Sequence, residues 1–164
     1  QLEIPQPTVR AALSLSKSQG VFSILDPAPC RRLSKSLLQL VDIITPNEFE
    51  LAELTGMPVK TKRNIECAGE KLFQTGVGEV IVTCGERGVC HLSSDGANWF
   101  SAPKVNAIDT VGAGDCFNGS LASALSSDLG MAEAIRFAVS TSAHAVTIRG
   151  VQSSFPELKP SNCY

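Results

Sequence analysis

The sequence predicts an α/β fold in which a mainly parallel sheet lies between two layers of helices. Short apolar runs of four to six residues alternate with longer amphipathic stretches, and this alternation implies right-handed strand–helix–strand crossovers. Of the 164 residues, 43% are hydrophobic and 18% are charged, so the chain can bury a sizeable core. We therefore expect a three-layer α/β/α unit, and no repeat or linker interrupts it.

The first part of the chain is expected to alternate between helix and strand. Val9 and Leu13 give the first helix an apolar face, and Gly20 ends it. The runs Val-Phe-Ser-Ile-Leu and Val-Asp-Ile-Ile are apolar enough to be strands. The sequence therefore predicts helices over residues 7–19 and 34–40 and strands over 21–25 and 41–44.

A further helix is expected to begin directly after the second strand, where three start signals coincide. Thr45 can cap the helix, Pro46 suits its first position, and Glu48 follows the cap by three residues. Gly56 is a typical helix end, and Pro58 lies just beyond it.

The second part of the chain continues the same alternation. Ser94-Asp95-Gly96 is typical of a tight hairpin turn. The remaining expected elements are a helix over 65–74, strands over 80–83 and 89–92, and helices over 114–126 and 131–147.

Composition excludes several classes of function. The net charge is −2, no block of Lys and Arg exceeds two residues, and no apolar run approaches the ~20 residues that span a bilayer. We therefore expect neither nucleic acid nor a membrane as partner. The chain opens on Gln1, with an apolar, strand-like stretch and no signal-peptide pattern, as expected for a segment of a longer protein.

The six cysteines show no Cys-x-x-Cys spacing, and there are only two histidines, so a zinc site has little support. We expect the cysteines to be reduced thiols of a cytoplasmic protein. Cys116 is expected to be a buried spacer and His144 a core histidine, whereas His91 is expected at the surface of a hairpin.

Polar residues follow the expected strands at their carboxyl ends. They are Asp26, Asn47, Thr83 and Asp109. In open α/β sheets the ligand lies beyond this edge, so the chemistry should be sought there.

The segment Asp109-Thr-Val-Gly-Ala-Gly-Asp115 combines an anion-binding turn with a carboxylate. Its small residues let a phosphate approach the backbone, and the N–H groups of the helix that follows point towards that phosphate. Asp115 can accept the proton of a hydroxyl that attacks phosphorus. The alternative is a tight strand-to-helix turn with a favourable first-turn carboxylate. The segment is not a Walker A motif, because no Gly-Lys-Ser/Thr follows it.

DTVGAGDCFNGSL, from Asp109 onward, resembles the C-terminal signature of the ribokinase (PfkB) carbohydrate kinase family. Other blocks resemble the family in the same order: QLEIP, Asp-Pro-Ala-Pro from Asp26, DIITPNEFELAELTG, VTCGERGV and AVTIRGVQSSFP. The matching blocks extend from near residue 2 to about residue 156. The resemblance implies a ribokinase-like fold, of which residues 1–164 form the C-terminal catalytic and nucleotide-binding portion. The N-terminal half, with the sugar-binding motif and the lid, has no counterpart.

The resemblance also implies roles for individual residues. Asp115 matches the catalytic base, and Gly112, Ala113 and Gly114 match its anion hole. Glu3 matches a sugar-contacting glutamate, with Asp115 as the second sugar contact. The positions that match the ATP site are Asn47, Thr83, Gly85, Gly88, Gly114 and Val139. In that family Val139 falls where a planar side chain can stack on adenine.

Two cations are implied in the same way. Asn47 and Glu50 match an Asn-x-x-Glu motif that tunes binding of Mg²⁺ and phosphate, and Glu50 is expected to hold Mg²⁺ through water. A K⁺ ion is expected beside the anion hole, mostly on backbone carbonyls. The matching positions are Asp109, Val111, Ala145, Gly150 and Ser154.

The implied function is ATP-dependent phosphorylation of the primary hydroxyl of a sugar, D-ribose to D-ribose 5-phosphate first among the candidates. Another kinase of the family, a fructokinase or an adenosine kinase, is an alternative. A truncated, catalytically incompetent chain that only binds nucleotide is a second alternative. The expected partners are a small-molecule sugar and ATP, and the full-length protein is expected to be a homodimer through its lid.

Overall fold

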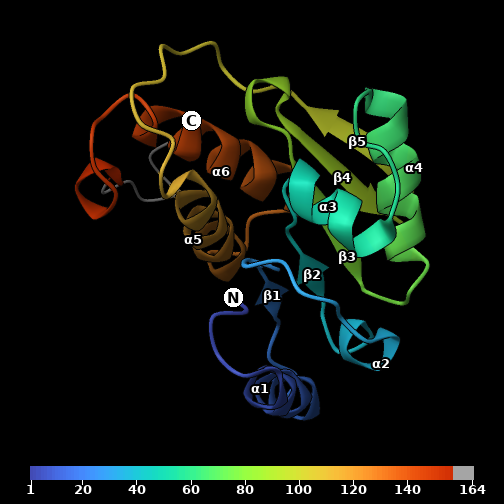
Figure 1. Cartoon of the computed structure of the whole chain (residues 1–164). Helices are drawn as coiled ribbons and strands as arrows, with labels where there is room; N and C mark the ends of the chain where they lie inside the picture. The colour runs from blue at the N-terminus through green and yellow to red at the C-terminus, as the bar shows by residue number, and fades with distance from the viewer. Residues whose placement is uncertain (157–164) are drawn as a thin grey trace. The chain divides into compact units, whose positions relative to one another are not determined.

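The computed structural model, drawn in Figure 1, describes residues 1–156. These residues form two compact units. The first unit comprises residues 1–84 and 90–99, and the second comprises residues 85–89 and the chain from residue 100 onward. Each unit is described by itself. Within residues 1–156, no helix is both long and apolar enough to cross a membrane.

A five-stranded sheet has its strands in chain order. Strands β1, β2 and β3 are parallel, with Ile24 opposite Ile43 and Ile43 opposite Glu79. Strand β5 follows β4 across the predicted turn, which is confirmed at residues 94–95. The strands are β1 (Ile24–Leu25), β2 (Ile43–Ile44), β3 (Glu79–Thr83), β4 (Val89–Ser93) and β5 (Gly96–Phe100).

The expected helices of the first unit are all present. The two strands expected over residues 21–25 and 41–44 are shorter than predicted, and Val21 and Phe22, at the start of the first one, are more than half exposed. Residues 1–5, expected to be strand-like, contain no strand. The helices are α1 (Gln6–Ser18), α2 (Lys35–Leu38), α3 (Glu48–Thr55) and α4 (Lys62–Phe73).

The N-cap of α3 is Asn47, so the prediction that Thr45 caps this helix is wrong. Asn47 Oδ1 accepts a hydrogen bond from the Glu50 N–H (2.9 Å), and Glu50 Oε2 accepts one from the Asn47 N–H (2.8 Å). Thr45 and Pro46 instead continue the β2 edge: the Thr45 N–H donates to the Leu25 carbonyl, and the Pro46 carbonyl accepts from the Thr83 N–H. Tertiary pairing thus moves the helix start by two residues.

Replacing Asn47 with Ala is expected to lower the free energy of unfolding by about 0.5–2 kcal/mol, because the Glu50 N–H loses the side-chain oxygen that accepts its hydrogen bond. Asn47→Ser, which keeps a good capping oxygen, should retain most of the stability. Urea unfolding of the two variants beside the wild type measures the difference. Equal loss in both variants would show that capping does not explain the role of Asn47 in stability.

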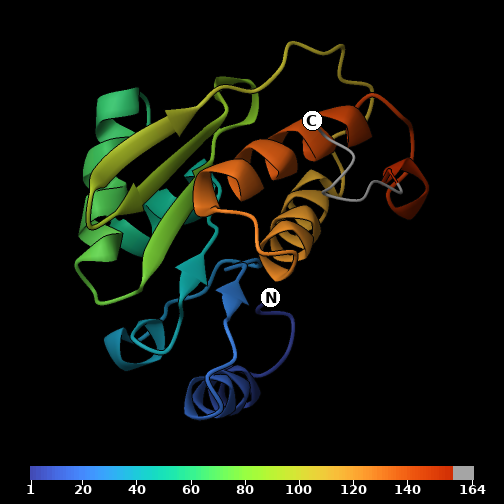
Figure 2. The same cartoon turned by 180° about the vertical axis from the view of Figure 1, so that it is seen from behind.

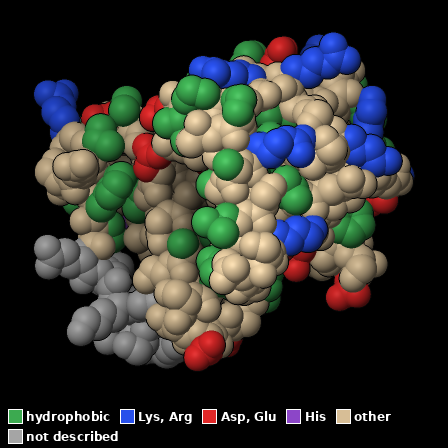
Figure 3. All heavy atoms as spheres, turned by 90° about the horizontal axis from the view of Figure 1, so that it is seen from below, with side chains coloured by type: hydrophobic (Ala, Val, Ile, Leu, Met, Phe, Trp, Pro, Cys, Tyr) green, Lys and Arg blue, Asp and Glu red, His purple; other side chains and the backbone are tan. Residues whose placement is uncertain are grey.

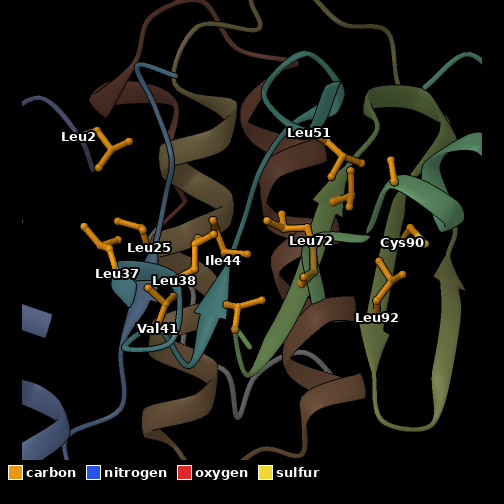
Figure 4. Packing of buried hydrophobic residues seen from close by; sticks show 14 of the residues in the cluster. Leu2, Leu25, Leu37, Leu38, Val41, Ile44, Leu51, Leu72, Cys90 and Leu92 are labelled. Atoms are coloured by element: carbon orange, nitrogen blue, oxygen red, sulfur yellow. The ribbon is translucent and has the colours of Figure 1, made fainter. Parts of the chain in front are cut away.

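The core of the first unit covers one face of the sheet (Figure 4). Val80 and Val82 belong to this cluster, whereas Ile81 between them is fully buried outside it. Alternate residues of a strand point to opposite faces, so β3 is buried on both faces, as the continuous apolar run predicts.

Helices α5 (Ala113–Ser126) and α6 (Met131–Ala145) of the second unit pack against each other (Figure 2). Leu121 and Ala124 of α5 and Ala134 and Ala138 of α6 are fully buried. Asp128, at a positive φ of 62°, lies in the connection between the helices.

Both predictions about the histidines are wrong. His91 lies on β4, is buried, and its Nε2 is 2.5 Å from Glu79 Oε2 on the neighbouring strand. His144 is exposed in the last turn of α6, where the buried positions are Thr141 and Ala145. His91 is buried because β4 lies beside β3 in the sheet. His144 is exposed because it does not lie on the buried face of α6.

The cysteines of the described residues are all free thiols, as predicted. Cys116 is buried, as expected of a spacer. Burial is the main cause that raises the pKa of Cys84 and of Cys90 to about 12, so both thiols stay protonated at neutral pH. Cys163 lies outside the described residues.

Candidate functional site

The glycine turn before α5 is held by contacts that only glycine permits. Gly112 is the N-cap of α5 at a φ of 79°, and a Cβ atom there would lie 2.5 Å from Val151 Cγ1. Gly114 is exposed, and a Cβ atom there would meet nothing within 4 Å. The positive φ therefore favours glycine at the first position, whereas the second leaves the backbone open to a ligand.

Asp115 lies in the first turn of α5, and its residue is exposed. It directly follows the glycine turn, at the helix end that carries partial positive charge. A carboxylate in this position is solvent-accessible and lies beside the backbone that can receive an anion. The structure therefore brings together the predicted base and the predicted anion hole, Gly112 to Gly114.

The Asp109 carboxylate joins two distant segments of the second unit. Its Oδ1 accepts a hydrogen bond from the Val111 N–H (3.1 Å), and its Oδ2 accepts one from the Gly150 N–H (3.2 Å). Both hydrogen bonds lower the pKa of Asp109, and the bond from Val111 has the larger effect. Because the folded pKa is lowered, this carboxylate stabilises the folded loop above its ordinary pKa, and the contribution is lost as the pH falls through the folded pKa.

The remaining positions of the predicted K⁺ site lie in the same unit. The Val146 carbonyl, next to Ala145, accepts hydrogen bonds from the N–H groups of Ile108 (2.8 Å) and Asp109 (3.1 Å). Ser154 is buried, and its Oγ donates to the Val151 carbonyl (2.7 Å). Among the described residues no cluster of three or more His, Cys, Asp or Glu side chains could hold a metal ion. A cation here would depend on carbonyl oxygens beside the single carboxylate of Asp109.

In the first unit, the carboxyl ends of the parallel strands bring the predicted polar residues together. Asn47, at the start of α3, forms a parallel bridge with Thr83 at the end of β3. Glu50, one turn into α3, is buried. Its pKa is raised, first by burial and then by the negative charge of Asp26 beyond β1. Asp26, Asn47 and Thr83 therefore lie at this edge. Asp109, the fourth predicted residue, belongs to the second unit and follows residues 101–108, which contain no strand.

Sequence reasoning did not find the proximity of Asp26 and Glu50, because the two residues lie on different elements. Nor did it find Cys30, whose Sγ lies 3.9 Å from the Glu50 carbonyl oxygen. Burial, followed by the charge of Glu50, raises the pKa of Cys30. No local sequence pattern predicts these contacts, because Asp26 and Cys30 follow β1 whereas Glu50 lies on α3, and only the folded chain brings them together.

Glu3 is exposed at a bend near the end of β1. The Leu2 N–H donates to the Ala28 carbonyl (2.7 Å), and Gln1 Nε2 donates to Asp26 Oδ2 (3.2 Å). These bonds place the first residues beside the Asp-Pro-Ala-Pro segment. The predicted sugar contact thus lies at the same edge of the first unit as Asp26.

The other predicted ATP positions differ in exposure. Gly85 is exposed at a φ of 54°, and Gly88 is buried at a φ of 88°, with its N–H bonded to the Gly85 carbonyl. Val139 is 5% exposed on α6. Val139 therefore has little side-chain surface left for contact with an adenine ring.

Residues 1–158 of the chain match the model of the family described as pfkB family carbohydrate kinase. It is 40% identical over 156 residues to a ribokinase of Haemophilus influenzae, covering 95% of this chain and 51% of that protein. It is 39% identical over 165 residues to a deoxyribokinase of Salmonella typhi, covering 100% of this chain and 54% of that protein. The chain thus spans about half the length of these relatives.

The structure of Arabidopsis thaliana ribokinase complexed with ribose and ATP is similar to the chain, with a TM-score of 0.91 and 32% identity. The similarity covers 98% of this chain and 52% of that one. It confirms the ribokinase-like α/β fold predicted from the sequence. Both the fold and the ordered sequence blocks lead to one conclusion: the chain belongs to the pfkB family of carbohydrate kinases.

Proposed function

We propose that this chain carries the ATP site and the general base of a kinase that phosphorylates the primary hydroxyl of a sugar, with D-ribose as the preferred substrate. The observation that carries the proposal is the exposed Asp115 directly after a glycine turn that a ligand can reach. A base and an anion hole on one turn are the parts that phosphoryl transfer needs.

Asp115 accepts the proton of the sugar hydroxyl as its oxygen forms a bond to the γ-phosphorus of ATP, and the bond from that phosphorus to the bridging oxygen breaks to release ADP. The backbone N–H groups of the turn, from Gly112 to Gly114, stabilise the charge on the transferring phosphoryl oxygens. Thr83, Gly85 and Gly88 bind the nucleotide, and Asn47 orients its phosphates.

The residues around Glu50 fit a magnesium ion held through water. The raised pKa of Glu50 reflects burial and the nearby charge of Asp26, and a cation beside the carboxylate would favour its charged form. Mg²⁺ usually keeps several waters and binds protein through one or two carboxylates plus substrate phosphates. When bound, Mg²⁺ would neutralise charge on the phosphates.

The loop around Asp109 fits a monovalent cation. The Asp109 carboxylate accepts hydrogen bonds from the N–H groups of Val111 and Gly150, and the backbone carbonyls of Ala145 and Ser154, in the same unit, would supply further oxygen ligands. A K⁺ ion on these oxygens would keep the loops beside Gly112 in place. Homodimerisation of the longer protein and a cytoplasmic location stay predictions.

A pentose as the acceptor is supported by the ribokinase and the deoxyribokinase that the chain resembles at similar identity. Glu3, at a bend near the end of β1, matches the sugar-contacting glutamate, and this match supports a pentose as the acceptor. Fructose and adenosine are the competing acceptors. A chain that only binds nucleotide is the second candidate, because this chain spans about half of its relatives.

The test is sugar-dependent release of ADP by the purified chain with ATP, Mg²⁺ and K⁺. D-Ribose, 2-deoxy-D-ribose, D-fructose and adenosine are compared at equal concentration, and ATP binding is measured separately by calorimetry. We expect the largest kcat/KM for D-ribose. A larger value for another acceptor would overturn the choice of sugar, and ATP binding without any turnover would favour the nucleotide-binding candidate.

A further inference from the structure

Basic side chains surround two serines at the start of α2. Arg31 and Arg32 precede Ser34 by three and two residues, and Lys35 follows it, so the local sequence is Arg-Arg-Leu-Ser-Lys-Ser. All of these side chains except that of Leu33 are exposed. Figure 3 looks at the molecule from the side where α1 and α2 lie in Figure 1, and Lys and Arg side chains gather on part of this face.

The backbone that carries this sequence is accessible without unfolding. Residues 30–34 contain neither helix nor strand, and Ser34 itself is extended, with φ −77° and ψ 148°. The segment is anchored beneath by Leu33, which packs against the core, and by Gln6 Nε2, which donates to the Arg32 carbonyl (3.0 Å). An enzyme can therefore bind the exposed side chains while the fold stays intact.

A third arginine contacts the serine hydroxyls from α1. Arg10 Nη2 donates to Ser34 Oγ (3.2 Å) and to Ser36 Oγ (2.7 Å), and the two hydroxyl oxygens are 3.2 Å apart. A guanidinium is thus already within hydrogen-bond distance of both oxygens. Its planar set of N–H donors matches the oxygens of a phosphate better than a neutral hydroxyl.

We propose that Ser34 is a phosphorylation site of an Arg-directed protein kinase, and that Arg10 binds the phosphate after transfer. Such a kinase selects its substrate by pairing acidic side chains with arginines before the serine. Ser34 Oγ forms a bond to the γ-phosphorus of the kinase-bound ATP, the bond to the bridging oxygen breaks, ADP leaves, and the serine proton passes to the catalytic aspartate of that kinase.

Ser34 is preferred over Ser36 for two reasons. The arginine pair lies two and three residues before Ser34 but four and five residues before Ser36. Ser36 also lies inside α2, whereas Ser34 lies before it. The inference does not rest on the proposed sugar kinase activity, because none of these residues belongs to that site.

The purified protein is incubated with ATP, Mg²⁺ and the catalytic subunit of an Arg-directed serine/threonine kinase, with a reaction lacking that kinase as blank. Cleavage before aspartates leaves residues 26–41 in one peptide, which tandem mass spectrometry reads. We expect one phosphate on Ser34, none in this peptide of Ser34→Ala, and full incorporation in Ser36→Ala. Arg31→Gln with Arg32→Gln should lower the initial rate about tenfold or more.

Phosphate on Ser36 in place of Ser34 would overturn the proposal, as would no incorporation into folded wild type. An unchanged rate in the double arginine variant would also overturn it. Because both arginines are exposed, thermal unfolding of that variant should match the wild type. A rate loss with matched unfolding is therefore a loss of recognition.

The role of Arg10 has its own readout, a ³¹P NMR titration of the phosphorylated protein. The second pKa of phosphoserine, ordinarily about 6, should be lower in the wild type than in Arg10→Gln. Lys17→Gln is the matched control, since Lys17 Nζ on the same helix donates to the Gln39 carbonyl. The same phosphoserine pKa in all three proteins would contradict phosphate binding by Arg10.

Discussion

Replacing Asp115 with Asn is expected to lower the kcat of sugar phosphorylation by about 10²–10⁴-fold, the usual contribution of a general base. Asn has nearly the same shape as Asp but cannot accept the proton of the hydroxyl. Because the residue is exposed in the first turn of α5, the substitution should leave the fold intact. ATP affinity should stay unchanged or rise slightly, since a negative charge near the phosphates is removed.

Asp128→Asn is the matched control for this loss. Asp128 is an exposed acidic residue after α5, and its positive φ suits Asn as well as Asp. The measurement is the pH dependence of kcat/KM for both variants beside the wild type. Full activity in Asp115→Asn would exclude Asp115 as the base. A collapse of ATP affinity together with kcat would assign Asp115 to the architecture of the turn.

Replacing Gly88 with Ala is expected to destabilise the second unit strongly. A Cβ atom at Gly88 would overlap the Phe100 carbonyl oxygen and lie 2.8 Å from the Ala102 nitrogen, and the φ of 88° already disfavours any side chain. A positive φ costs about 1–2 kcal/mol for an L-residue, and overpacking adds about 1–3 kcal/mol. Both partners are backbone atoms, so no side-chain rotation can relieve the contact.

Gly85→Ala separates the two contributions. Gly85 also has a positive φ, 54°, but a Cβ atom there would meet nothing within 4 Å. We expect Gly85→Ala to lower the free energy of unfolding only by the cost of the positive φ, about 1–2 kcal/mol. Guanidinium unfolding monitored by circular dichroism measures both variants. If Gly85→Ala lost as much stability as Gly88→Ala, steric overlap with Phe100 would not be the cause.

The sequence by itself predicted the features that depend on neighbours along the chain. The order of helices and strands, the hairpin turn before β5 and the glycine-containing turn that ends in Asp115 are all local patterns. The ordered blocks from QLEIP to AVTIRGVQSSFP also indicated the ribokinase-like family and fold. Apolar periodicity and turn residues act over a few positions, so they can be recognised without coordinates.

Only the tertiary structure decided which of several locally acceptable arrangements occurs. Thr45 and Asn47 can both cap a helix, and the bridge between Asn47 and Thr83 selects Asn47. The burial of His91 depends on its place beside β3. The proximity of Asp26 to Glu50 depends on how parallel strands end at one edge.

The contact of Arg10 with Ser34 likewise joins residues 24 positions apart. Each of these contacts forms because burial of the shared core brings distant segments together. The free energy of that burial is non-directional, so no short sequence pattern encodes which polar side chains finally meet.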